Sequence, residues 1–189
     1  MIHTSLLPDV EIPDTLLTPF VLRHAERLAD KPALVDGASG RTLTYGEFAN
    51  AVKALAGGLK ARGFGKGDVL AIMAPNLPEY AVAFHGTAWA GATVTTINPT
   101  YTAHEVQHQL KDSGASLLVT VSMFLPIAKE AVAGTGVTSI FTIDPSDAEP
   151  LTALMGEPLQ EQVEVAPDDV VALPYSSGTT GLSKGVMLT

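Results

Sequence analysis

The chain has 189 residues, of which 46% are hydrophobic and 16% charged, a balance that predicts a folded globular domain rather than disorder. It contains no cysteine, which excludes disulfides, thiolate catalysis and cysteine-based zinc sites. Its net charge of −9, from 11 Lys and Arg against 20 Asp and Glu, argues against a nucleic-acid surface and against attraction to anionic lipid.

No targeting or membrane-spanning segment is predicted. The first residues, MIHTSLLPDVEIPD, have no basic region, and acidic residues and proline precede any long apolar run, so they do not resemble a signal peptide. The most apolar long stretch, residues 81–94, is interrupted by His85 and falls short of the ~18 apolar residues that a membrane helix needs. We therefore expect a cytoplasmic protein without a membrane span.

Helical and strand-like hydrophobic patterns alternate from the start of the chain. Residues 15–29 predict a first helix, and residues 33–44 predict a short hairpin. Thr44 and Glu47 have the spacing of a capping box, which opens a helix that Gly63 ends.

The alternation continues to residue 143. The expected strands are residues 68–74, 92–97, 116–121 and 137–143. The expected helices run to Trp89, to about Lys111 and over residues 122–133. Asn76 with Glu79, and Thr102 with Glu105, are the expected N-terminal caps of the first two. Strands that alternate with helices of this length predict an α/β fold with a largely parallel sheet.

The last quarter of the chain departs from this pattern. Residues 144–169 are acidic and contain proline, so we expect a connecting segment between the core of residues 1–143 and a strand–loop–strand unit over residues 170–189. Residues 170–175 and 186–189 are the two expected strands. Because the second strand has no successor, the chain is predicted to be one partial domain.

A run of serine, threonine and glycine between these two strands is the most distinctive motif. Such a run can fold into a nest of backbone N–H groups, to which the hydroxyl groups and Lys184 add donors suited to a polyphosphate. Flexible surface loops have the same composition, so the residues alone leave both interpretations open. The motif is not a Walker A loop, because Ser183 and Gly185 stand where that motif needs glycine and serine or threonine.

The segment YSSGTTGLSKGVMLT resembles the phosphate loop of the adenylate-forming (AMP-binding) superfamily, which includes acyl-CoA synthetases and 4-coumarate–CoA ligases. The segments RTLTYGEF, GDVLAIMAPNLPEY and GATVTTINPTYTAHEV are similar to characteristic segments of the same family, in the same order. The last of them is most like 4-coumarate–CoA ligases and their fatty-acyl relatives. The resemblance implies the N-terminal part of the large domain of an acyl-adenylate synthetase.

This resemblance also implies a reaction. An acid–CoA ligase converts a carboxylic acid, here an aryl or fatty acid, and ATP into an acyl-adenylate and pyrophosphate, and then forms a thioester with CoA. The residues that would hold the ATP phosphates are Ser176, Ser177, Gly178, Thr179, Thr180, Gly181 and Lys184. One departure is Ser183, where many members have proline.

The family's remaining active-site residues, those for Mg²⁺ included, lie downstream of this loop. We therefore expect no complete catalytic set in this chain and no activity from the chain alone. The interrupted sheet would leave an unpaired edge, through which we expect a possible homodimer.

Two alternatives remain open. The chain could be a non-catalytic α/β module, with an interaction or structural role and weak phosphate binding. It could also be a zinc hydrolase, since His104, Glu105 and His108 form a literal HExxH motif. Against zinc, both histidines are expected opposite the apolar helix face that includes Val106, and Glu105 already serves the capping box.

Overall fold

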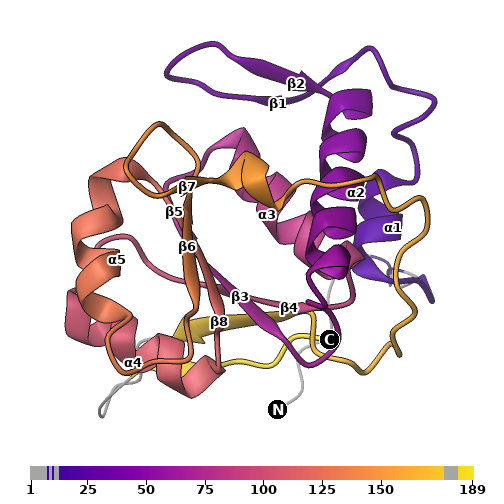
Figure 1. The fold of residues 1–189 in the computed structure, drawn as a ribbon. Helices are drawn as coiled ribbons and strands as arrows, with labels where there is room; N and C mark the ends of the chain where they lie inside the picture. The colour runs from indigo at the N-terminus through magenta and orange to yellow at the C-terminus, as the bar shows by residue number, and fades with distance from the viewer. Residues whose placement is uncertain (1–7, 9, 11–12, 177–182) are drawn as a thin grey trace.

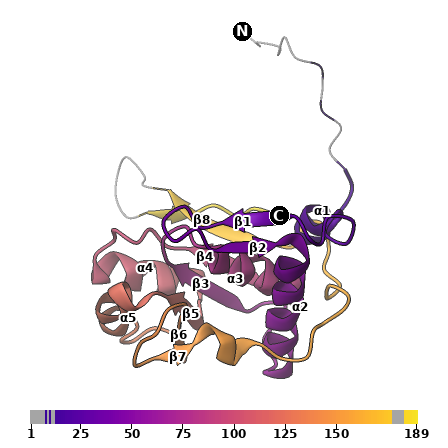
Figure 2. The same cartoon turned by 90° about the horizontal axis from the view of Figure 1, so that it is seen from above.

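The computed structural model describes residues 8, 10, 13–176 and 183–189. It confirms the predicted α/β class: seven strands form one sheet in the order β7-β6-β5-β3-β4-β8-β9, and every pair is parallel except β8 with β9 (Figure 1). The strands are β3 (Val69–Met73), β4 (Thr93–Thr96), β5 (Leu117–Thr120), β6 (Ser139–Thr142), β7 (Glu149–Pro150), β8 (Ala172–Ser176) and β9 (Lys184–Gly185). Figure 2 shows β8 at one side of the sheet and β6 and β7 at the other.

Helices cover both faces of this sheet. The helices are α1 (Leu17–Leu22), α2 (Tyr45–Ala61), α3 (Pro78–Trp89), α4 (Ala103–Ser113) and α5 (Leu125–Ala131), with short 3₁₀ turns η1 (Ser122–Phe124) and η2 (Leu151–Leu154). Leu70 and Ile72 of β3 pack with α2 and α3, whereas Ala71 and Met73 pack with α4 and α5. Successive strand residues point to opposite faces, so this all-apolar strand is buried on both sides.

Local sequence signals explain where two helices begin and end. Thr44 N donates to Glu47 Oε2 at 2.8 Å, and Glu47 N donates to Thr44 Oγ1 at 3.2 Å, which confirms the predicted capping box of α2. Thr102 and Glu105 form the second capping box, at α4. After α2, Gly63 adopts a φ of +75°, a left-handed conformation that glycine reaches without steric cost.

The acidic segment after β6 packs along α2. Gly156 N donates to the carbonyl of Ala54 at 2.9 Å, and a Cβ on Gly58 would lie 1.8 Å from the carbonyl oxygen of Leu154.

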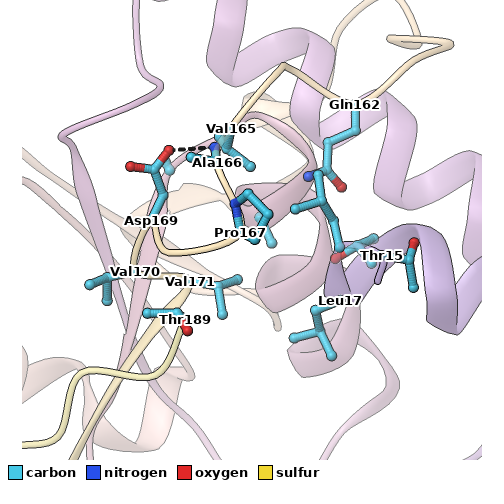
Figure 3. A pocket seen from close by; sticks show the side chains of 15 residues that line it. Thr15, Leu17, Gln162, Val165, Ala166, Pro167, Asp169, Val170, Val171 and Thr189 are labelled. Carbon is cyan, nitrogen blue, oxygen red and sulfur yellow. Dashed lines mark hydrogen bonds between the residues drawn. The ribbon is translucent and has the colours of Figure 1, made fainter. Parts of the chain in front are cut away.

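Further on, the segment borders a mostly apolar cavity of about 100 Å³ beside α1 (Figure 3). Asp169, at its rim, accepts from Ala166 N at 2.7 Å. The predicted division of the chain into residues 1–143, 144–169 and 170–189 remains a prediction.

The first helix was predicted too long. It ends at Leu22 instead of reaching residue 29, and turns with hydrogen bonds three residues apart follow it. The guanidinium of Arg23 donates to the carbonyl of Phe20, so a side chain satisfies one of the free carbonyl groups in the last turn of the helix.

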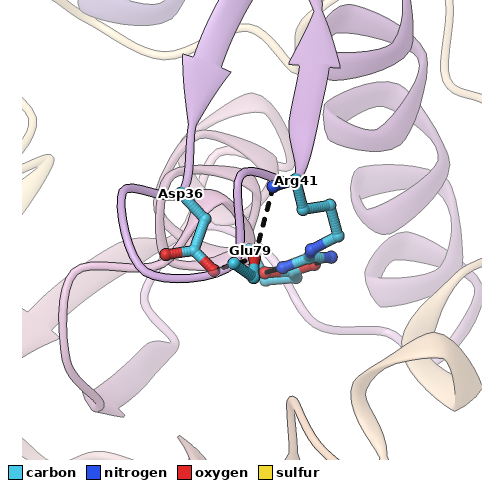
Figure 4. A network of polar contacts seen from close by, with 4 residues as sticks. Asp36, Arg41 and Glu79 are labelled. Carbon is cyan, nitrogen blue, oxygen red and sulfur yellow. Dashed lines mark hydrogen bonds and ion pairs between the residues drawn. The ribbon is translucent and has the colours of Figure 1, made fainter.

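The predicted Asn76–Glu79 cap is also wrong. Leu77 is the N-cap of α3 and makes no side-chain hydrogen bond, while Pro78 fills a first-turn position where no N–H is needed. Glu79 instead pairs through both carboxylate oxygens with Arg41, which ties the hairpin of β1 (Pro32–Val35) and β2 (Thr42–Thr44) to α3 (Figure 4).

The last predicted strand begins earlier than expected. Residues 184–185 form β9, and the chain then continues antiparallel to β8, with Leu188 N donating to the carbonyl of Ala172 at 3.0 Å. This leaves Val186 and Met187 exposed at the edge of the sheet. The homodimer through this edge remains a prediction. Within the described ranges, none of the helices is long and apolar enough to span a bilayer.

Candidate functional site

A hairpin made by β8 and β9 carries the predicted phosphate-binding residues. In its register Ser176 lies opposite Lys184, and Tyr175 lies opposite Gly185. Both Ser176 and Lys184 are exposed, so a hydroxyl and an ammonium group stand across from each other where the hairpin opens. The structure therefore brings together the first and last of the predicted site residues. Ser177, Gly178, Thr179, Thr180 and Gly181 lie outside the described residues, and their role remains a prediction.

The position of β8 is fixed by its parallel partner β4. Thr93 Oγ1 donates to the carbonyl of Val170, and Thr95 Oγ1 donates to the carbonyl of Leu173, each at 2.8 Å. Gln109 of α4 is fully buried and donates to Thr95 Oγ1 at 2.8 Å. Side chains from the sheet and from α4 thus hold β8 in register. As a result, Ser176 lies at the carboxyl edge of the parallel strands, where ligands of open α/β sheets bind.

Helix α4 also reaches the hairpin directly. Tyr175 Oη donates to Asp112 Oδ2 at 2.6 Å, and His108 Nε2 lies 3.2 Å from the carbonyl oxygen of Ser183. Burial raises the pKa of the Tyr175 phenol, and the hydrogen bond and negative charge of Asp112 raise it further. Tyr175 therefore stays protonated and remains a hydrogen-bond donor at neutral pH.

A cleft of about 350 Å³ opens beside this hairpin, at the carboxyl ends of β3, β4 and β8. Among the described residues, no charged side chain lines it, and the polar ones that do are Asn76, Tyr80, Thr96, Asn98, Tyr101, Gln109 and Tyr175. Burial raises the pKa of Tyr80, so this phenol is also protonated at neutral pH. The cleft suits a neutral polar group.

The sequence did not identify the contacts that α4 makes with the hairpin. His108 was expected in solvent with His104, but only His104 is exposed and His108 is half-buried against Ser183. The spacing of His108 and Asp112, one helical turn apart, was the available signal. Their partners could not be inferred, because Asp112 and Tyr175 are separated by 63 residues.

The described residues do not form the zinc site of the HExxH alternative. Glu105 accepts from Thr102 N at 2.8 Å and from Thr102 Oγ1 at 2.7 Å, and these bonds lower the pKa of its carboxyl. His108 is turned to a carbonyl oxygen, and within the described ranges no three His, Asp or Glu side chains are grouped so as to hold a metal. The zinc-hydrolase interpretation is therefore not supported.

The described residues do not fit a magnesium site either. Asp112 is the carboxylate that contacts the hairpin, and it accepts the hydrogen bond from Tyr175. A Mg²⁺ site needs several free oxygen ligands in near-octahedral geometry. The described part of the chain therefore supplies no set of ligands for Mg²⁺.

Sequence similarity identifies the family of this chain. The pattern of the AMP-binding enzyme family matches residues 21–189. The chain belongs to this family. It is 42% identical over 193 residues to "4-coumarate--CoA ligase 3" of Oryza sativa subsp. japonica, an alignment that covers 100% of this chain and 35% of that protein. It is 41% identical over 193 residues to "4-coumarate--CoA ligase 1" of Petroselinum crispum, with 100% and 36% covered.

A solved structure with a similar fold supports the same assignment. The long-chain-fatty-acid–CoA ligase from Archaeoglobus fulgidus superposes with a TM-score of 0.86 at 30% identity, covering 99% of this chain and 39% of that one. The chain thus spans about a third of the length of the relatives it matches. Its fold is that of the N-terminal portion of the large domain of an acyl-CoA ligase.

Proposed function

We propose that this chain supplies the phosphate-binding part of an ATP-dependent acid–CoA ligase. The observation that carries the proposal is the hairpin that places Ser176 opposite Lys184, in a chain about 40% identical along its whole length to 4-coumarate–CoA ligases. The exposed hydroxyl and ammonium groups can both donate hydrogen bonds to the oxygens of a polyphosphate.

In the proposed reaction, a carboxylate oxygen of the acid attacks the α-phosphorus of ATP, and the bond to the bridging oxygen breaks. The products are an acyl-adenylate and pyrophosphate. The thiol of CoA then attacks the acyl carbon, losing its proton, and AMP leaves with the electron pair of the broken C–O bond. Negative charge grows on the departing pyrophosphate, so the positive charge of Lys184 stabilises that transition state. Ser176 orients the same phosphates, and Ser177, Gly178, Thr179, Thr180 and Gly181 would add further donors.

The substrate class follows from the relatives. Proteins named for 4-coumarate and for a long-chain fatty acid both resemble this chain, so we propose a small aryl or fatty carboxylic acid. The chain covers 35% of the first of these relatives, and we propose that it is inactive alone. Mg²⁺ would accompany ATP, held by the phosphates and by residues outside this chain.

The experiment uses the complete product of the gene that encodes this chain. Pyrophosphate release is measured with ATP, Mg²⁺ and CoA in the presence and absence of 4-coumarate or a long-chain fatty acid. We expect acid-dependent release, and a loss of about 100-fold in kcat for Lys184→Ala. Lys129→Ala is the matched control, because Lys129 is also exposed and pairs with Asp147 away from the hairpin. Release that does not depend on either acid, or an unchanged rate for Lys184→Ala, would overturn the proposal.

A further inference from the structure

Helix α4 contacts both arms of the β8–β9 hairpin through two side chains on one of its faces. Asp112 accepts from Tyr175, in the arm that leads into the phosphate-binding segment, and His108 contacts Ser183, in the arm that leads out of it. Residues four apart on a helix project from the same face, so one rigid element contacts both arms. Each contacted residue directly precedes a described site residue, Ser176 in one arm and Lys184 in the other.

The polarity of both contacts is fixed by their chemistry. A carbonyl oxygen can only accept, so His108 must carry a hydrogen on Nε2 and donate it to Ser183. In the other contact, the Tyr175 hydroxyl donates to the Oδ2 oxygen of Asp112. The hairpin therefore presents one acceptor and one donor to α4, and α4 carries the matching partner for each.

The residue opposite Tyr175 explains how its ring can lie across the hairpin. Gly185 faces Tyr175 in the register, and a Cβ built on this glycine would lie 3.2 Å from two ring carbons. A side chain at this position would push the ring by a few tenths of an ångström and move its hydroxyl relative to Asp112. The glycine thus allows the contact between β8 and α4.

Helix α4 is itself held firmly in place. Val106 and Leu110 are fully buried against the sheet. Gln109 Nε2 donates to Thr95 Oγ1 at 2.8 Å and to the carbonyl of Thr96 at 3.0 Å. The helix is therefore fixed to the same strand, β4, that sets the register of β8.

We propose that His108 and Asp112 are positioning residues, which hold Ser176 and Lys184 at the separation and orientation that the ATP phosphates require. The inference rests on the proposed function of the hairpin. Neither residue needs to touch the nucleotide, because each acts through the residue next to a phosphate ligand. The assignment also gives a role to the second histidine of the HExxH sequence, His108.

The test compares variants of the complete gene product by steady-state kinetics, with KM measured separately for ATP, the acid and CoA. We expect His108→Ala and Asp112→Ala each to raise KM for ATP about tenfold, the effect of losing roughly one hydrogen bond to a charged or polar group. KM for the acid should stay within about twofold of the wild-type value. His104→Ala is the matched control, because His104 lies one turn earlier on the same helix and is exposed.

Rescue by conservative variants separates positioning from a general loss of structure. In His108→Gln the amide Nε2 can still donate to the Ser183 carbonyl, so most of the ATP affinity should return. Tyr175→Phe removes one hydroxyl and should raise KM for ATP as Asp112→Ala does. If the two residues act through one hydrogen bond, the double variant with Tyr175→Phe and Asp112→Ala should have the same KM for ATP as either single variant.

Any one of three results would overturn the inference. The first is an unchanged KM for ATP in His108→Ala, Asp112→Ala and Tyr175→Phe. The second is an equal rise of KM for the acid. The third is a His108→Gln protein as impaired as His108→Ala. Lys184→Ala distinguishes this failure from failure of the proposed function. If Lys184→Ala reduces activity while His108→Ala and Asp112→Ala leave KM for ATP unchanged, only the positioning role is wrong. If Lys184→Ala leaves activity unchanged, the proposed phosphate site itself is wrong.

Discussion

The central strands and the β8–β9 hairpin belong to the same sheet but are stabilised in different ways. All five residues of β3 and all four of β5 are buried, and their side chains pack against helices on both faces. In the hairpin, β8 is half-buried and β9 is exposed, and single side-chain hydrogen bonds join β8 to β4 and the two arms to α4. Burial of apolar area stabilises the fold, whereas a few polar contacts orient the site. Substitutions in the two regions should therefore separate stability from function.

The largest expected effect on stability comes from the centre of the sheet. Leu118 of β5 is fully buried, and Leu118→Ala should lower the free energy of unfolding by about 3 kcal/mol through lost apolar contacts and a cavity. Met123→Ala is the control, because Met123 is 78% exposed. In the hairpin, Tyr175→Phe should cost less than about 1 kcal/mol. Urea unfolding of each protein measures these changes. Similar losses of unfolding free energy for Leu118→Ala and Tyr175→Phe would contradict the difference in stabilisation between the central strands and the hairpin.

A second effect is expected where the acidic segment crosses α2. A Cβ on Gly58 would lie 1.8 Å from the Leu154 carbonyl oxygen, which is backbone and cannot rotate away. Gly58→Ala should destabilise the chain by about 2 kcal/mol, because overpacking outweighs the gain of about 1 kcal/mol in helix propensity. Gly37→Ala, where a Cβ would meet nothing within 4 Å, is the control. Equal midpoints of thermal unfolding for the two variants would show that the segment does not pack against α2 in this way.

The smallest expected effect is a change in how stability depends on pH. His85 projects from α3 toward α1 and α2: Thr18 Oγ1 of α1 is 3.0 Å from its Nδ1, and the rings of Phe48 and Phe84 pack against it edge-on. Burial lowers the pKa of its imidazole below the usual value of 6.5. The unfolded chain therefore binds the proton more readily than the folded one.

The sign follows from this difference in proton binding. The contribution of His85 to stability is fully present above about pH 6.5 and is lost as the pH falls toward the lower pKa of the folded state. His85→Gln should show a flatter stability profile than the wild type between about pH 7.5 and pH 5.5. Carboxyl groups such as Glu79, whose pKa the Arg41 ion pair lowers, titrate in both proteins and cancel in the difference. Parallel profiles would contradict burial of a neutral His85.

Signals that act within a few residues were readable in the sequence. The alternation of strand-like and helical patterns gave the α/β class, and the capping boxes at Thr44 and Thr102 gave the starts of α2 and α4. The Asn76 cap failed because Arg41, 38 residues away from Glu79, took that carboxylate. Local patterns carry no information about such distant partners.

The same limit applies to the site. The resemblance of the loop sequence to a known phosphate loop predicted roles for Ser176 and Lys184. It did not show that these two residues lie opposite each other in the antiparallel strands β8 and β9. The role of α4 was missed because periodicity places His108 on a helix face without saying which strand covers that face. The register of β8 and β9, together with the packing of α4 beside them, supplies that information.

Equilibrium binding of ATP·Mg²⁺, measured by calorimetry on the complete gene product, tests whether the β8–β9 hairpin holds the nucleotide. Wild-type protein is compared with Lys184→Ala and with His108→Ala. If the hairpin binds the phosphates and α4 orients it, both variants should bind ATP about tenfold or more weakly, with Lys184→Ala the weaker of the two. Wild-type affinity in Lys184→Ala would contradict the account, because the nucleotide would then be held without the cation at the open end of this hairpin.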